Sequence, residues 1–162
     1  MAVTNKSVIV RSVTPEVWEE GYFAYTSSDS EVIYPGYLVY QYSGGITGGD
    51  MPQALPTYRV NADVNYPPCI VFENDLIGET IDDDIASGDL IRVKYLEVGA
   101  RYVVYGQAST AVAIGTLLSP HTDGTVIVNA GPGNNSQTLF RAETAVADTD
   151  TDTRLVVRCL RV

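Results

Sequence analysis

Residues 90–95, Leu90-Ile91-Arg92-Val93-Lys94-Tyr95, decide the fold class. Ile91, Val93 and Tyr95 share one face of this run, and the two basic residues between them share the other. A period of two is typical of a β-strand with one buried and one solvated face. Residues 97–101 then turn the chain into a second apolar run at 102–105, so two consecutive strands are predicted.

Short runs of the same character recur along the chain. They are rich in β-branched and aromatic residues and predict further strands at 8–11, 37–42, 58–60, 70–72, 113–118, 125–129, 139–147 and 155–162. Fourteen glycines and eight prolines fall largely between them, as turns require. The Asp123-Gly124 pair accommodates a positive φ and predicts a hairpin. One short helix is expected at 15–20, capped by Thr14 and ended by Gly21.

The predicted fold class is therefore all-β: an antiparallel β-barrel or β-sandwich with long loops and at most one short helix. A length of 162 residues suits one domain. We expect an extended N-terminal arm over 1–14 and a single β-rich domain over 15–162. Residues 43–50 are glycine-rich and are expected to form a flexible loop.

Charge and composition restrict the partners. The chain has 20 acidic and 10 basic residues, a formal net charge of -10, which disfavours nucleic acid and anionic membranes. The opening residues lack the features of a secretory signal, so we expect synthesis in the cytoplasm. The two cysteines, Cys69 and Cys159, stand in apolar runs without metal-ligand spacing and are expected to be buried, inert thiols.

No motif in the sequence predicts catalysis, and we expect neither an enzyme nor a cofactor. His121 is the single histidine and stands in a turn, where a solvated side chain is expected. Residues 131–136 and 44–49 are glycine-rich, but they lack the endings that nucleotide-binding loops need.

Of the two acidic runs in the sequence, one could bind calcium. Asp148, Asp150 and Asp152 match the start of a calcium loop, but Thr153 stands where glycine is needed and Cys159 where glutamate is needed. The main interpretation is a solvated hairpin tip, and calcium binding stays open. Residues 82–84 are three consecutive aspartates, whose mutual repulsion predicts exposure.

Residues 85–162 resemble the head-decoration, or capsid cement, proteins of tailed phages and related viruses. The residues that carry the resemblance are 86–93, 112–118, the hairpin at 123–126, 140–145 and 155–160. The resemblance implies a β-barrel or sandwich that oligomerises, often as a homotrimer, and stabilises an assembled shell of major capsid protein from outside. The location implied is the exterior of the virion capsid. No catalytic residues, cofactors or metal ligands are implied.

Two segments are candidate contacts with the capsid or with another subunit. An extended arm can add a strand to a neighbour's sheet, which selects Val8, Ile9 and Val10. Eleven tyrosines stand against three phenylalanines, and the run 36–42 is apolar on both faces, with Leu38, Tyr40 and Tyr42 on one and Tyr37 and Val39 on the other. Such a strand either lies deep in the fold or meets another chain. Tyr37, Tyr40 and Tyr42 are therefore the remaining candidate contact residues.

An alternative function is a carbohydrate-binding or host-adhesion module, in which tyrosines would stack on sugars. The sequence leaves open the oligomer number, the virus and host, and whether residues 1–80 form a separate attachment surface.

Overall fold

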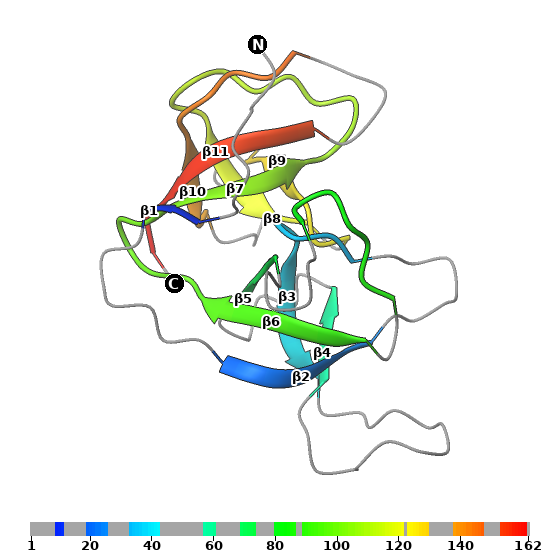
Figure 1. The fold of residues 1–162 in the computed structure, drawn as a ribbon. Helices are drawn as coiled ribbons and strands as arrows, with labels where there is room; N and C mark the ends of the chain where they lie inside the picture. The colour runs from blue at the N-terminus through cyan, green and yellow to red at the C-terminus, as the bar shows by residue number, and fades with distance from the viewer. Residues whose placement is uncertain are drawn as a thin grey trace.

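The computed structural model describes residues 9–11, 19–25, 33–42, 57–60, 69–73, 80–86, 89–121, 123–129, 138–147 and 153–161. Within these segments every regular element is a β-strand, which confirms the all-β class (Figure 1). The strands are β1 (Ile9–Arg11), β2 (Glu19–Tyr25), β3 (Leu38–Tyr42), β4 (Thr57–Val60), β5 (Cys69–Phe72), β6 (Leu90–Tyr95), β7 (Arg101–Gly106), β8 (Leu117–Pro120), β9 (Val126–Val128), β10 (Phe140–Ala142) and β11 (Thr153–Cys159).

The strands form two bodies, one above the other in Figure 1. The first, here called the N-terminal barrel, closes in the order β2-β4-β3-β5-β6, and only its β2–β4 pair is parallel. The second, the C-terminal sheet, has the order β1-β7-β11-β10-β8-β9. A single parallel pairing of Gly106 with Val126 links β7 to β9, so the sheet curls back on itself.

Strand β5 joins the two bodies because it is buried on both faces. Cys69 and Val71 belong to the core inside the N-terminal barrel, whereas Ile70 and Phe72 belong to the core of the C-terminal sheet. This alternation is the period of two of a strand, with each face covered by a different layer. The core of the C-terminal sheet also includes Leu38 of β3, so this core extends from one body into the other.

The prediction for β6 is correct for Ile91 and Val93 and wrong for Tyr95 and Lys94. Ile91 and Val93 are buried, but Tyr95 is 42% exposed. Lys94 is buried, and its Nζ lies 2.7 Å from Glu97 Oε1. Its aliphatic stem lies in apolar surroundings while the ammonium finds a carboxylate, so a lysine can stand where alternation predicts solvent.

The helix expected at 15–20 is wrong where it can be checked. Glu19 and Glu20 begin β2, with Glu19 opposite Val93, and residues 15–18 lie outside the described residues. Gly21, expected to end a helix, lies inside the strand. Pairing with β6 on one side and β4 on the other outweighs local capping signals, because it supplies ladder hydrogen bonds along both edges.

Two other strands are shorter than predicted. Residues 113–116 form a turn with Gly115 at φ 89°, so β8 begins only at Leu117. The run 139–147 contributes only β10. The hairpin at 121–124 is confirmed: β8 and β9 pair antiparallel, and Gly124 has φ 84°. Both cysteines are buried free thiols, as predicted.

Candidate functional site at the junction of barrel and sheet

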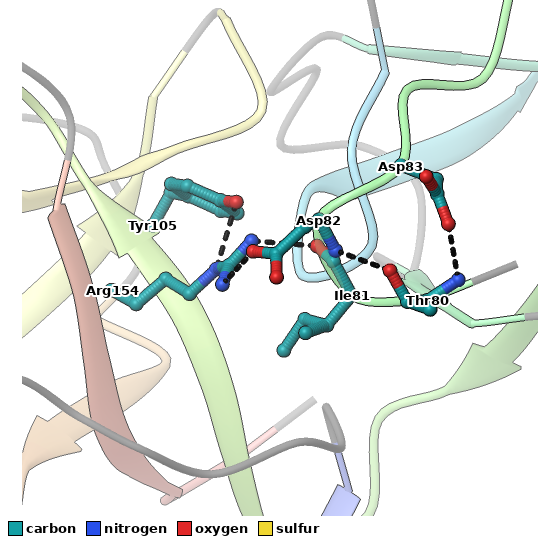
Figure 2. Close-up of polar contacts among 6 residues, drawn as sticks. All are labelled: Thr80, Ile81, Asp82, Asp83, Tyr105 and Arg154. Carbon is teal, nitrogen blue, oxygen red and sulfur yellow. Dashed lines mark hydrogen bonds and ion pairs between the residues drawn. The ribbon is translucent and has the colours of Figure 1, made fainter.

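The guanidinium of Arg154, on β11, links the two bodies. Its Nε donates to Tyr105 Oη at 2.8 Å, its Nη1 to Asp82 Oδ1 at 2.7 Å, and its Nη2 to the carbonyl of Ile81 at 2.6 Å. Figure 2 shows Arg154 extended between Tyr105 of the sheet and the segment 80–83, which belongs to the connection between β5 and β6. One side chain therefore joins three separate chain segments.

A local turn presents Asp82 to Arg154. The amide of Thr80 donates to Asp83 Oδ2 at 2.6 Å, and the amide of Asp82 donates to Thr80 Oγ1 at 3.3 Å (Figure 2). The hydrogen bonds from Thr80 hold the pKa of Asp83 below its ordinary value. The side chains of the acidic run 82–84 are exposed, as the sequence predicts. Asp82 is 76% exposed and is nevertheless engaged by Arg154.

Three tyrosines surround the same junction. The Tyr105 ring centroid lies 5.1 Å from that of Tyr37 and 6.1 Å from that of Tyr34, and Tyr34 and Tyr37 are 5.6 Å apart in an edge-on arrangement. Burial raises the pKa of Tyr105, outweighing the hydrogen bond from Arg154. These rings pack mainly against one another, which is the arrangement aromatic side chains favour in a protein interior.

A second polar cluster lies on the sheet near the other end of β11. Both carboxylate oxygens of Glu143 are occupied: Oε1 accepts from Arg158 Nε at 2.6 Å, and Oε2 accepts from Arg101 Nε. Burial acts to raise the pKa of Glu143, but the two arginines outweigh it and hold the pKa below its ordinary value. Arg101 and Arg158 keep side-chain exposures of 37% and 39%.

His121 is more constrained than the solvated turn residue that the sequence predicts. Its Nδ1 lies 2.9 Å from Asp123 Oδ1, its Nε2 lies 3.4 Å from Gln107 Nε2, and its side chain is 29% exposed. Ser119 on the same strand is buried, and its Oγ has no hydrogen-bond partner among the described residues. Since the ring nitrogens contact Asp123 and Gln107, the histidine ties the β8–β9 hairpin to the end of β7.

The predicted contact residues fall in different places. Ile9 and Val10 lie in β1, which pairs antiparallel with β7 of the same chain, and Val8 lies outside the described residues. Tyr40 and Tyr42 lie in β3, opposite Arg59 and Thr57 of β4.

Tyr37 is half-buried at the junction, and its neighbours Leu38 and Val39 are both buried, so this run lies deep in the fold at its start. Sequence reasoning missed the arginines and Glu143, because their meeting depends on strand register.

The candidate calcium ligands Asp148, Asp150 and Asp152 lie outside the described residues. Among the residues that are described, no group of three or more His, Cys, Asp or Glu side chains is arranged to hold a metal ion. In the same segments, no helix combines the length and apolarity needed to cross a membrane.

Comparison with known proteins gives one structural likeness to report. The chain matches no protein-family model and no curated protein. Among solved structures it is similar to the N base of the head fiber gp8.5 of bacteriophage phi29. The identity is 18% and the TM-score 0.48, and the match covers 90% of this chain and 98% of that chain. At this identity and score, we infer neither family nor function from the likeness.

Proposed function

We propose that this protein is a structural protein of the phage head that binds the outer surface of an assembled capsid as an oligomer and stabilises it. The observation that carries the proposal is the resemblance of residues 85–162 to head-decoration proteins, taken together with the unit that this stretch forms. Strands β7 to β11 all fall inside it and form the C-terminal sheet with β1, while β6 at its start belongs to the N-terminal barrel.

The N-terminal barrel supports the proposal as a rigid addition to that module. Leu38, Ile70 and Phe72 place apolar side chains in the core of the C-terminal sheet, and Arg154 holds the junction from outside. Close-packed protein interiors resist deformation. A rigid body is what a shell-reinforcing protein needs, because a flexible one would not transmit load between its contacts.

Repetition makes weak contacts sufficient. A subunit bound at each equivalent position of a lattice, and linked to its neighbours in an oligomer, gains from effective concentration without any single strong site. The net charge of -10 keeps free subunits soluble until specific contacts form.

A cosedimentation assay tests the proposal. The full-length protein is mixed with undecorated capsids of a candidate phage, and the pelleted fraction is measured, together with the temperature at which the shells release DNA. We expect saturable binding and a higher release temperature. Protein that binds no capsid at any concentration would contradict the proposed function.

Two N-terminal deletions test the arm. Removal of residues 1–8 leaves β1 intact, whereas removal of residues 1–11 also removes β1 and uncovers the edge of β7 at Arg101 and Tyr102. If β1 contributes to attachment, the longer deletion loses capsid binding and the shorter one keeps it. Unchanged binding by the longer deletion would remove the arm from the proposal.

A further inference from the structure

Three arginines occupy one row across three neighbouring strands, and the backbone of β1 places Arg11 at the next register position. Arg11 on β1 is opposite Arg101 on β7, Arg101 is opposite Arg158 on β11, and Arg158 is opposite Arg141 on β10. Directly opposed residues project from the same face of a sheet. We call Arg101, Arg158 and Arg141 the arginine row, with Arg11 at its register position beyond the end.

Among the described residues, the three arginines of the row share a single carboxylate partner. Glu143 is shared by Arg101 and Arg158, while Arg141 is exposed and makes no ion pair within the described part of the chain. Like charges directly opposite one another in a sheet are destabilising. A protein with twice as many acidic as basic residues nevertheless places three of its eight arginines in this row, which makes the row a candidate surface for an external anion.

The chemistry of the row favours a protein carboxylate as that anion. The bridging of Glu143 by two Nε atoms shows the row binding a carboxylate already. Beside it, Leu117 is opposite Arg141 and is 47% exposed, and Ile114 in the preceding turn is 70% exposed. Arginine combined with exposed apolar side chains is characteristic of protein–protein interfaces, whereas nucleic acid would be repelled by the net charge.

The same chain carries an exposed carboxylate run at 82–84. Its Asp84 is exposed and has no ion-pair partner among the described residues. Arg154, which contacts Asp82, precedes Arg158 by four positions along β11, or about 13 Å at the usual rise of a strand. The run therefore lies too far along the sheet to neutralise the row of its own molecule.

We propose that the arginine row binds the Asp82–Asp84 run of a second copy of this chain. A head-to-tail contact sets the row of one copy against the run of the next, and a rotation that closes it gives a ring. In a twofold contact, each of two copies would set its row against the run of the other. This inference rests on the self-association in the proposed function and names the surfaces that would carry it.

Charge reversal tests the contact. The variants are Arg141→Glu, Asp84→Lys and the double variant carrying both, whose net charge equals that of the wild type. Molar mass is measured by size-exclusion light scattering over a concentration series at low and high salt. We expect self-association of the wild type that weakens with salt. Each single variant should dissociate about tenfold more readily or worse, and the double variant should recover.

Several outcomes would overturn the inference. They are a wild type that stays monomeric at all concentrations, a single variant that associates as tightly as the wild type, or a double variant that does not recover. Circular dichroism confirms folding, and Arg141→Gln, which removes the charge without reversing it, should give an intermediate effect.

Capsid binding, measured separately, distinguishes the two proposals. A monomeric protein that still binds capsids, and loses binding in Arg141→Glu, would assign the row to the capsid and overturn the second-copy contact. A protein that self-associates through the row and binds no capsid would leave this inference standing and remove the proposed function.

Discussion

The side chain of Arg154 makes hydrogen bonds to both the C-terminal sheet and the segment that connects β5 to β6. Its planar fork reaches a phenol, a carboxylate and a backbone carbonyl at once, and its Cζ lies 5.0 Å from the centroid of the Tyr105 ring. Lysine cannot reproduce this geometry, because its ammonium is a point charge without a fixed fork. The two partners on the barrel side differ in exposure, which allows their contributions to be separated.

Arg154→Met keeps much of the aliphatic stem and removes all three hydrogen bonds. We expect a loss of about 1–2 kcal/mol in the free energy of unfolding, because the Ile81 carbonyl and the Tyr105 hydroxyl lose their donor. Asp82→Asn should cost less than about 0.5 kcal/mol, since Asp82 is mostly exposed and its ion pair is screened. Urea denaturation measures both, and equal costs for the two variants would contradict this ordering.

Glu143 makes stability depend on pH. Its pKa in the folded protein lies below the ordinary value, so the ionised form stabilises the fold at and above the unfolded pKa of about 4.3. That contribution is lost as the pH falls through the folded pKa.

Urea midpoints of the wild type should therefore fall as the pH drops below about 5, and Glu143→Gln should fall less steeply. Arg158→Gln should flatten the curve in the same direction, because it removes one cause of the low pKa. Identical slopes in all three proteins would show that Glu143 has no part in the acid response.

At the scale of elements, the turn before β3 fixes how the N-terminal barrel meets β7. Gly36 has φ 102°, its amide donates to the Val71 carbonyl at 2.8 Å, and a Cβ at this position would lie 3.1 Å from the Val103 carbonyl oxygen. A Cβ at this position would therefore fit against β7 only if the backbone of one of them shifted by a few tenths of an ångström.

Gly115 is a matched control for Gly36. It also has a positive φ, of 89°, but a Cβ there would meet nothing within 4 Å. Gly115→Ala should cost about 1 kcal/mol from the strained φ alone, and Gly36→Ala about 2 kcal/mol or more, because the contact with Val103 adds to it. Thermal and urea unfolding measure the difference. Similar losses of stability in the two variants would mean that the backbone of β7 shifts at little cost to accommodate the new Cβ.

The elements that the sequence predicts best are those whose pattern is local. Alternation and turn residues place most strands, and the Asp123-Gly124 pair places the β8–β9 hairpin. Strand β2 is not predicted, because Glu19 and Glu20 lie between a helix-start signal at Thr14 and a helix-end signal at Gly21, and only pairing with β4 and β6 makes them extended. The arginine row could not be predicted from the sequence, because it depends on the register between strands that are far apart in the chain. No single run of sequence contains that information.

For the whole molecule, the decisive feature is that one core spans both bodies. The sequence predicts a single β-rich domain, but it does not show that a barrel and a sheet share a layer, since a strand buried on both faces looks like any apolar run. Ile70 and Phe72 face the sheet from the barrel wall, so the two bodies should lose their stability together.

Ile70→Ala tests this coupling. The side chain is fully buried in the shared core, so its truncation should cost about 2–5 kcal/mol. Hydrogen exchange read by mass spectrometry reports the two bodies separately, through peptides covering 69–72 and 101–106. We expect exchange to accelerate in both by the same factor, because the bodies open as one cooperative unit. Ile114→Ala, at a 70% exposed position, should change neither. Faster exchange in 69–72 with unchanged protection of 101–106 would show that the two bodies unfold independently. Mechanical load on one body would then not be transmitted to the other.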